Sequence, residues 1–275
     1  DHEVNVWNGE CWSNVTIVQT GKDRPVVKVH FDNGSVVECT PQHRWWVETA
    51  KNTGNGREPR RFETKDLVSG MRIIKHALPV IDIEGAGDFP HAYTSGFFTG
   101  DGTYNNKSPN NPQGNPCALL YGPKIDLIPN LEIERSTFKP GADGSIYVVF
   151  PSGMPPKFTV PDASYSLKSR LEWLAGFADA DGCDQRGSQS HGIDLYSSDP
   201  EFLKDVMMML QTIGVSSRVT KKSDGKFQTF KTKKGEKVDR WCNAGYRIHI
   251  SPFYRDKLIG LGFRTNRLKC PKNPP

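Results

Sequence analysis

The amino-acid sequence predicts an α+β protein in which an all-β segment is followed by two units that mix helices and strands. Three observations predict this class. Residues 1–50 read as short alternating strands, and two similar segments recur eighty residues apart, at positions 93–102 and 173–182. After each of these segments we expect a similar order of strand, helix, strand or hairpin, and helix. A segment that recurs in this way indicates one supersecondary unit used twice.

The all-β segment is expected from its turn signals and its apolar runs. Asn8-Gly9 and Asn33-Gly34 favour tight turns, because both residue types tolerate positive φ angles. A short helix at 64–67 and a strand at 71–75 complete the segment, which we place at residues 1–88. The earlier strands are expected at residues 4–7, 16–18, 26–31 and 36–39.

The two later units are expected at residues 91–166 and 167–275, and each opens with one of the recurring segments as a helix. In the second unit Asp199-Pro200 favours the start of another helix, with a capping carboxylate and a proline in the first turn. The apolar face of that helix holds Phe202, Leu203, Val206, Met207, Leu210 and Ile213. Around it we expect strands at 192–196, 218–220 and 246–250 and a final helix at 253–261.

Composition and charge narrow the class of protein. The chain has 275 residues, a net charge of +5 and a pI of about 8.8, and this mild basic excess fits a nucleic-acid partner. No apolar run approaches the roughly 20 residues that cross a bilayer, and the N-terminus lacks a signal-peptide pattern, so we expect neither a membrane partner nor secretion. The six cysteines are scattered without a CxxC pair, which is typical of reduced thiols in an intracellular protein.

Small residues stand four positions apart in both recurring segments, a spacing that lets two helices approach closely. They are Gly96 and Gly100 in the first segment, and Gly176 and Ala180 in the second. Phe97 and Phe177 are then expected to point into the core of their own unit. Each helix should end at an aspartate followed by glycine, Asp101-Gly102 and Asp181-Gly182, because glycine commonly follows a helix end.

The second recurring segment, Leu-Ala-Gly-Phe-Ala-Asp-Ala-Asp-Gly at residues 174–182, resembles the motif that names the LAGLIDADG family of homing endonucleases. The first, at residues 94–102, resembles the looser form found in that family's first repeat. The resemblance covers roughly residues 91–270. It implies a pseudo-twofold fold of two αββαββα-like repeats, and a monomer whose curved sheets lie on the major groove of a long, asymmetric site in double-stranded DNA.

The paired aspartates carry the expected chemistry. A carboxylate in the last turn of a helix opposes the helix dipole, and two such ends packed together repel each other. A divalent cation offsets both effects, and Mg²⁺ takes one or two carboxylates together with water and phosphate oxygens. The resemblance implies that Asp101 and Asp181 bind Mg²⁺, for which Mn²⁺ can substitute, helped by the carbonyls of Gly100 and Ala180. The alternative is a pair of Asp-Gly capping turns without chemistry.

Members of the family also hold a lysine near each scissile phosphate, close to the end of each repeat. The resemblance implies this catalytic role for Lys269 in the second repeat and for Lys157 in the first. The alternative for each is a solvated surface lysine. Asp179 has Thr99 as its counterpart in the first segment, so we expect a helix-face or supporting group there rather than a metal ligand.

A basic region between residues 218 and 240 is expected to contact DNA. Its lysines would meet phosphates, which gives affinity rather than sequence choice, whereas Gln228 and Arg240 are candidates to read base edges. The candidate DNA-binding residues are Arg218, Lys221, Lys222, Lys226, Gln228, Lys231, Lys233, Lys234 and Arg240. The alternative is a flexible, solvated loop. The polar stretch 103–116 is expected to form a loop after the first helix.

The N-terminal segment resembles part of the Hint splicing domain of inteins, at residues 4–9 and 36–47. The spacing Thr40-x-x-His43 matches the block in which the histidine, helped by the threonine, polarises the scissile amide. A β-meander with an edge histidine is the alternative. Splicing needs Cys or Ser at the first residue and a terminal Asn preceded by His. This sequence begins with Asp1 and ends in Pro-Pro, so we expect that it does not splice.

From these features we expect a Mg²⁺-dependent, site-specific endodeoxyribonuclease that breaks both strands of a long DNA site by hydrolysis. The resemblance implies that it belongs to an intein-associated mobile genetic element. Two alternatives stay open. One is a catalytically inactive DNA- or RNA-binding protein, or a maturase, of the same fold. The other is a remnant of a protein-splicing intein, in which residues 1–88 are a vestige or an extra DNA-binding arm.

Overall fold

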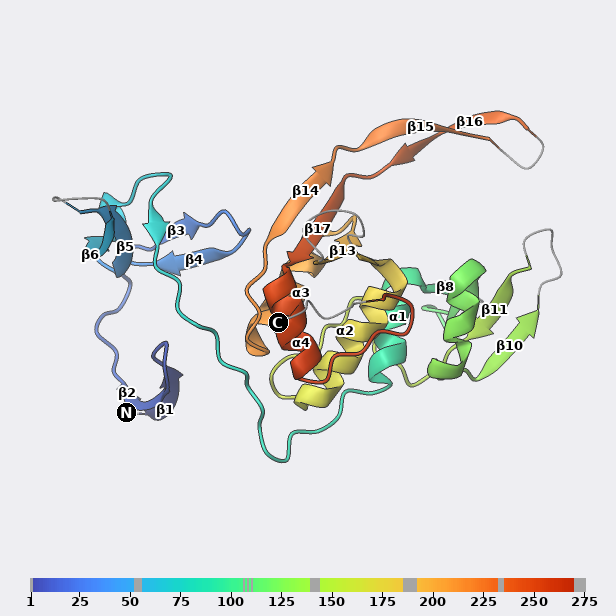
Figure 1. The fold of residues 1–275 in the computed structure, drawn as a ribbon, viewed down its shortest axis with the longest axis horizontal. Coiled ribbons are helices and arrows are strands. Elements are labelled where there is room, and N and C mark those ends of the chain that lie inside the picture. The colour runs from blue at the N-terminus through green and yellow to red at the C-terminus, as the bar shows by residue number, and fades with distance from the viewer. Residues whose placement is uncertain are drawn as a thin grey trace. The chain divides into compact units, whose positions relative to one another are not determined.

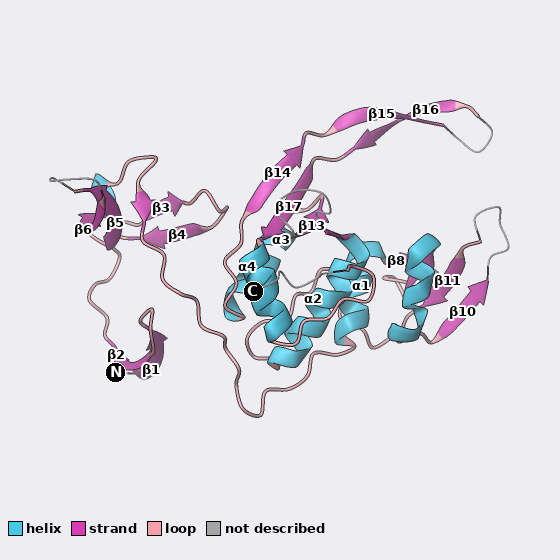
Figure 2. Ribbon diagram, viewed as in Figure 1, coloured by secondary structure: helices cyan, strands magenta, loops and turns pink. Residues whose placement is uncertain are grey.

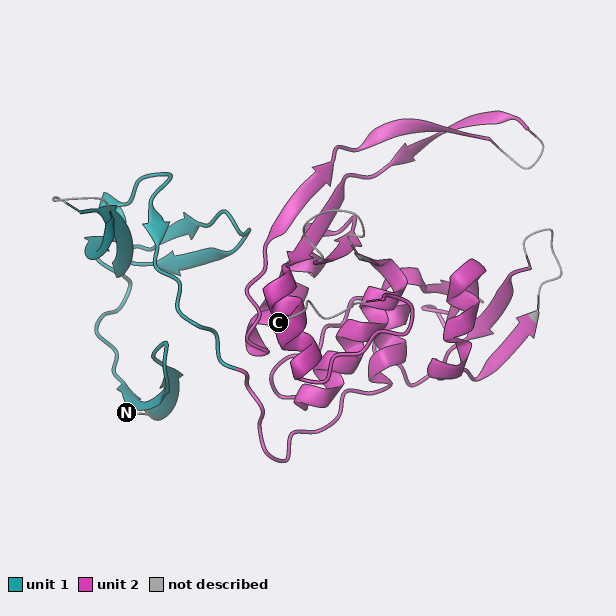
Figure 3. Cartoon of the chain, in the orientation of Figure 1, with its two compact units in different colours: residues 1–79 teal, residues 80–275 magenta. Residues whose placement is uncertain are grey.

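The structure is a computed structural model that describes residues 2–51, 56–105, 107, 109, 111–138, 144–184, 192–231 and 235–269. The chain divides into two compact units, Asp1–Pro79 and Val80–Pro275, which Figure 3 draws in different colours. Within the described ranges, no helix is long and apolar enough to span a membrane.

The described part of the N-terminal unit is built from short antiparallel strands and one 3-10 helix (Figure 2). The elements are β1 (His2–Trp7), β2 (Trp12–Ile17), β3 (Val27–His30), β4 (Val36–Cys39), β5 (Arg44–Ala50), β6 (Arg57–Glu63), η1 (Thr64–Asp66) and β7 (Arg72–Ile73). Gly9 and Gly34 have φ angles of 106° and 92°, so both predicted turns are present, between β1 and β2 and between β3 and β4. A third sheet has the strand order β6-β5-β7.

The described part of the second unit contains α1 (Ala92–Asp101), α2 (Leu167–Asp181), α3 (Pro200–Thr212) and α4 (Pro252–Gly260). Helix α3 begins where its sequence predicts. The Asp199 carboxylate accepts hydrogen bonds from the N–H groups of Glu201 and Phe202, and Pro200 occupies the first turn. These contacts satisfy donors that would otherwise be left without partners at the start of a helix.

A four-stranded antiparallel sheet follows each of the first two helices. The first contains β8 (Thr103–Asn105), β9 (Asn115–Leu120), β10 (Arg135–Phe138) and β11 (Ile146–Val149). The second contains β12 (Gly182–Asp184), β13 (Ile193–Ser197), β14 (Val219–Ser223) and β17 (Gly245–Ile250). The strands of both sheets lie in the same spatial order. If the four strands of each sheet are numbered along the chain, the order is first, second, fourth and third, which gives β8-β9-β11-β10 and β12-β13-β17-β14.

Strands β14 and β17 continue outward into a second hairpin, β15 (Lys226–Lys231) and β16 (Lys237–Cys242), so that together they form a long ribbon (Figure 1). This ribbon contains the described part of the basic region. In β15 and β16 nearly every side chain is exposed. The hairpin therefore owes little of its stability to a core of its own.

Each half of the second unit has its own apolar core. Phe97 and Phe98 of α1 pack with residues of the first sheet in one cluster. Trp173 and Phe177 of α2 pack with α3, α4 and the second sheet in another. The prediction that Phe97 and Phe177 point into different cores is therefore confirmed.

Three sequence expectations for the first half differ from the structure. Residues Gly122–Asn130 form a 3-10 helix, η2, rather than an α-helix, because Pro129 inside it lacks the N–H donor that an α-helical turn needs. In residues 144–166 no helix follows β11, so the first half lacks the last helix of an αββαββα order. The loop expected at 103–116 was wrong in part, since Thr103–Asn105 pairs with residues 115–117.

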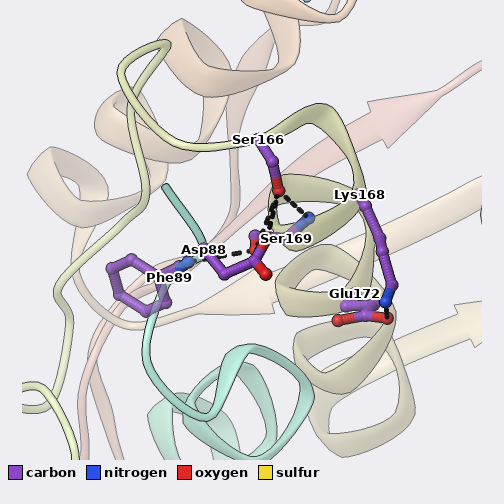
Figure 4. A network of polar contacts seen from close by, with 6 residues as sticks. All are labelled: Asp88, Phe89, Ser166, Lys168, Ser169 and Glu172. Carbon is purple, nitrogen blue, oxygen red and sulfur yellow. Dashed lines mark hydrogen bonds and ion pairs between the residues drawn. The ribbon is translucent and has the colours of Figure 1, made fainter. Parts of the chain in front are cut away.

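A polar network joins the segment before α1 to the start of α2 (Figure 4). Ser166 caps α2 by accepting a hydrogen bond from the N–H of Ser169 at 3.2 Å. Both serine hydroxyls donate to Asp88 Oδ1, at 2.7 and 3.0 Å, and the Ser166 bond is the main reason that the pKa of Asp88 lies below its ordinary value. Ser169 also accepts from the N–H of Phe89 at 3.0 Å. The network fixes the chain entering α1 against the first turn of α2.

Candidate active site

Helices α1 and α2 lie side by side with their backbones in contact (Figure 1). A β-carbon added to Gly96 would overlap the carbonyl oxygen of Trp173, and one added to Gly176 would overlap the carbonyl oxygen of Tyr93. The contact is reciprocal, with the glycine of each helix lying against the backbone of the other. The close approach of the two helices therefore depends on glycine at these two positions, as the spacing of small residues in the sequence predicts.

This packing brings the C-terminal ends of both helices together. Asp101 and Asp181 are the last residues of α1 and α2. A β-carbon on Gly100 would lie 2.5 Å from Ala180 Cβ and 3.0 Å from Asp181 Oδ2. Burial, and then the charge of Asp101, raise the pKa of Asp181 above its ordinary value. Because each carboxylate also faces the negative end of its own helix, the pair needs a positive partner.

Lys124 of η2 supplies one such partner. Its ammonium lies 2.5 Å from Asp101 Oδ2. That oxygen is buried and accepts no hydrogen bond from the part of the chain that the structure describes, so the contact is an ion pair without directed hydrogen bonding. A buried carboxylate oxygen with unused acceptor capacity is suited to a metal ion.

Lys157, the candidate from the first repeat, also lies at this site. Its ammonium donates to the carbonyl of Gly102 at 2.5 Å, directly after α1. Its backbone N–H donates to the hydroxyl of Tyr104 at 3.0 Å. Burial lowers the pKa of Lys157, while the charges of Asp181 and Asp101 act in the opposite direction. The structure therefore brings Lys157 together with both predicted metal ligands.

Lys269, the candidate from the second repeat, is exposed. A different cation, Arg267, lies at the end of α2 and donates to the carbonyls of Ala178 at 3.1 Å and Gly182 at 2.7 Å. Its charge is among those that act to lower the pKa of Asp181. Gly182 follows α2 as Gly102 follows α1, so Arg267 and Lys157 bind corresponding carbonyls. Arg267 and Lys124 were not among the predicted site residues, because neither belongs to a recognisable sequence motif.

Asp179 stabilises the packing of the two helices through hydrogen bonds of its side chain. Its side chain is fully buried and accepts hydrogen bonds from the backbone N–H groups of Asn266, Arg267 and Leu268, at 2.7 to 3.2 Å. The hydroxyl of Tyr93 on α1 donates to the same carboxylate at 2.7 Å. Asp179 thus holds residues 266–268 and both helices together, which is a supporting role rather than that of a metal ligand.

Replacing Asp179 with alanine should lower the free energy of unfolding by at least about 3 kcal/mol, because three buried or part-buried backbone donors would lose their acceptor. Urea unfolding followed by circular dichroism measures this change. Asp205→Ala, at an exposed position of α3, is the matched control and should change stability by no more than about 0.5 kcal/mol. A loss of under about 1 kcal/mol for Asp179→Ala would contradict the supporting role.

The residues present fit a divalent cation. Two carboxylates from different helices converge: Asp101 has a buried oxygen that is ion-paired with Lys124, and the pKa of Asp181 is raised. Among the described residues no group of three His, Cys, Asp or Glu side chains could hold a metal, so carbonyls, water or phosphate would complete the coordination. Mg²⁺ binds in this way. Of the two carbonyls predicted to help, that of Ala180 accepts a long 3.5 Å hydrogen bond from Arg267.

The described candidate DNA-binding residues lie on the long ribbon or directly before it, and all of them are exposed. Gln228 and Arg240 are directly paired across β15 and β16. Lys221 forms an ion pair with Asp224. Lys233 and Lys234 lie outside the described residues. The other exposed members of the set are Arg218, Lys222, Lys226 and Lys231.

The Hint-like pair lies in the N-terminal unit, at the turn before β5. The backbone N–H of His43 donates to the carbonyl of Thr40 at 3.0 Å. The His43 side chain is exposed, with its ring 5.0 Å from that of Trp45, and Thr40 is half-buried. The turn brings the two residues together, while their role in splicing chemistry stays a prediction.

Comparison with known families and proteins gives two kinds of match. Residues 168–247 match the LAGLIDADG-like domain, a range that runs from the first turn of α2 into β17. The large subunit of ribonucleoside-diphosphate reductase from Invertebrate iridescent virus 6 is 35% identical over 280 residues, which cover 99% of this chain. The chain spans only 28% of that protein's length.

Structural neighbours include homing endonucleases. A mesophilic variant of I-DmoI is similar with a TM-score of 0.37 and 14% identity, over 65% of this chain and 97% of that one. I-DmoI in complex with DNA and Mn is similar with a TM-score of 0.35 and 14% identity, over 63% of this chain and 94% of that one.

Proposed function

We propose that this chain is a site-specific endonuclease that hydrolyses both strands of a long, asymmetric DNA target. The observation that carries the proposal is the meeting of Asp101 and Asp181 at the ends of two helices in backbone contact. Two buried or half-buried carboxylates that repel each other and oppose two helix dipoles destabilise the metal-free protein. Such a destabilising arrangement of charges is typical of an active site.

The proposed cofactor is Mg²⁺, with Mn²⁺ as a substitute. Asp101 and Asp181 would hold it, with help from the carbonyls of Gly100 and Ala180. A bound divalent cation stabilises charge on the attacking and leaving oxygens of a phosphodiester. Lys124 and Lys157, whose charges act on the two aspartates, are proposed to bind the scissile phosphates, and Arg267 is proposed to hold the end of α2 in place.

DNA is proposed to lie across the two sheets that follow α1 and α2. Their identical strand order supports a pseudo-twofold arrangement within one monomer, in which each half contacts one half of an asymmetric site. The exposed lysines of β15 and β16 would bind phosphates beyond the centre of the site. Such an enzyme acts inside the cell, where its DNA is.

Replacing Lys226, Lys231 and Lys237 together with glutamine should weaken DNA binding for all sequences alike and make it less dependent on salt. Each phosphate contact that is lost should reduce the slope of log affinity against log salt by about 1. Fluorescence anisotropy across a salt series measures the slope. Lys168→Gln, at a side chain that is 77% exposed at the start of α2, is the control with no expected change. An unchanged slope in the triple variant would exclude this hairpin as a phosphate contact.

The similarity to a reductase subunit suggests where the target lies. We propose that the chain belongs to a mobile element carried in the reading frame of a ribonucleotide reductase, and that Thr40 and His43 are part of a Hint-like splicing segment of that element. The target would then be a reductase gene that lacks the element. DNA of the uninterrupted gene, incubated with the protein and Mg²⁺, should be cut once near the insertion point, while the interrupted gene should resist.

Two other functions would give different results in the same experiment. Tight binding to the uninterrupted gene without a cut would favour a catalytically inactive DNA-binding protein. Binding to structured RNA instead would favour a maturase. Failure to bind or cut any nucleic acid would contradict the proposal.

A further inference from the structure

A fully buried carboxylate lies on the second sheet, in the strand next to the one that follows α2. Asp194 stands in the middle of β13, and its side chain has no exposed surface. Its neighbours along the strand, Ile193 and Leu195, belong to the core cluster beneath the sheet. Because alternate residues of a strand point to opposite faces, Asp194 points to the face opposite that core.

Among the residues that the structure describes, three side chains on the same face bind this carboxylate. Arg247 Nη1 donates to Asp194 Oδ2 at 2.6 Å, the Tyr196 hydroxyl donates to the same oxygen at 3.1 Å, and His249 Nδ1 lies 2.7 Å from Oδ1. Burial alone would raise the pKa of Asp194, yet that pKa lies below its ordinary value because His249 and Arg247 donate to the carboxylate and Arg247 is positively charged. Asp194 is therefore held as a carboxylate anion.

The register of the sheet explains this cluster. His249 is directly opposite Asp194, and Arg247 is directly opposite Tyr196 on one side and Thr220 on the other. Directly paired residues of antiparallel strands project from the same face. The side chains of Arg247 and His249 remain 24% and 34% exposed, so the buried carboxylate holds two donors at the surface of the sheet.

Stability alone does not account for a buried charge in this place. A well-packed apolar side chain is often as stabilising as a buried ion pair, or more so. The opposite face of the same strands is apolar, so apolar side chains would fit the strand pattern. What the cluster does provide is a fixed orientation for Arg247, whose guanidinium carries five N–H donors in a rigid fork.

We propose that Asp194 is a positioning residue that holds Arg247 and His249 as base-reading side chains, with Arg247 recognising a guanine in the half of the target that the second sheet covers. An arginine fork matches O6 and N7 of guanine in the major groove. The inference rests on the proposed endonuclease function, because it needs DNA on this face. It adds readers on β17 to the pair Gln228 and Arg240 on the outer hairpin.

The test is to sequence the cut ends that the full-length protein produces from a randomised DNA library in Mg²⁺. The wild-type profile should show one strongly preferred guanine in one half-site. Arg247→Lys keeps the charge but not the fork, and Asp194→Asn keeps the shape but not the charge. Both should reduce the preference at that position by about ten- to a hundredfold and leave the preferences at the other positions in place.

Lys222→Gln, at an exposed lysine of β14, is the comparison variant and should lower cutting of all sequences alike. An unchanged profile in Arg247→Lys, or an equal loss at every position, would overturn the inference, because a purely structural role gives that second pattern. Arg247→Lys leaves a positive charge beside the buried carboxylate. This variant can therefore still test the inference if Asp194→Asn does not fold. If the wild-type protein cuts nothing, the proposed function fails first and this inference fails with it.

Discussion

Asp181→Asn is expected to reduce DNA cleavage by about a thousandfold or more, because it removes one of two carboxylates that would hold the cation and several kcal/mol of transition-state stabilisation depend on that cation. The same substitution should stabilise the metal-free protein at neutral pH. Burial and the nearby charge of Asp101 raise the pKa of Asp181. The folded protein therefore binds this proton more tightly than the unfolded chain, and stability falls as the pH rises through the window between the two pKa values.

The measurement has two parts, a cleavage rate in Mg²⁺ and a thermal unfolding midpoint in EDTA. The midpoint of the wild-type protein should fall relative to that of Asp181→Asn as the pH rises from about 4 towards neutrality, since 3.8 is the ordinary pKa of the group. The cleavage rate of the wild-type protein should instead fall as the pH is lowered, because the Asp181 carboxylate is then protonated. Asp205→Asn, at an exposed position of α3, should leave both quantities unchanged. A destabilised Asp181→Asn protein would contradict the strained pair.

Gly176→Ala is the second large expected effect. The added β-carbon would overlap the carbonyl oxygen of Tyr93, and backbone cannot move aside as a flexible side chain can. We expect the free energy of unfolding to fall by about 3 kcal/mol or more, the upper end for overpacked sites. Gly96→Ala should behave alike, because its β-carbon would meet the carbonyl of Trp173. Urea unfolding measures both variants.

The matched control is Gly260→Ala at the end of α4, where an added β-carbon has nothing within 4 Å. Alanine is the better helix former, so this change should be neutral or stabilise by up to about 1 kcal/mol. A small loss of stability in Gly176→Ala, similar to that of the control, would mean that α1 and α2 do not pack backbone against backbone. The two aspartates would then have no reason to be close.

Local sequence patterns predicted the helix pair because each pattern has a direct physical cause. Glycines four residues apart permit close packing, and Asp-Gly marks the end of each helix. The start of α3 followed from Asp199 and Pro200, whose capping bonds are present. Turns at Gly9 and Gly34 followed from Asn-Gly pairs. In all these cases the residues that make up the predictive pattern lie within a few positions of one another in the sequence.

The features that the sequence did not predict depend on distant contacts. Lys124 reaches Asp101 from η2, where prolines interrupt any helical periodicity. Arg267 reaches the end of α2 because Asp179 binds the backbone around it, whereas the neighbouring Lys269 is exposed. Strand β8 is polar and short, so its pairing with β9 leaves no alternating pattern. Such contacts follow from the packing of whole elements, which no local pattern encodes.

The central claim is that Asp101 and Asp181 form one metal-dependent centre that cuts DNA. The most direct measurement is cleavage of a randomised plasmid library by the purified protein in Mg²⁺, beside Asp101→Asn, Asp181→Asn and a reaction with Ca²⁺ in place of Mg²⁺. We predict discrete double-strand cuts at one long sequence, which are lost in both variants and in Ca²⁺. Cutting that persists in both variants would contradict the claim, as would the absence of any cut by a wild-type protein that binds DNA.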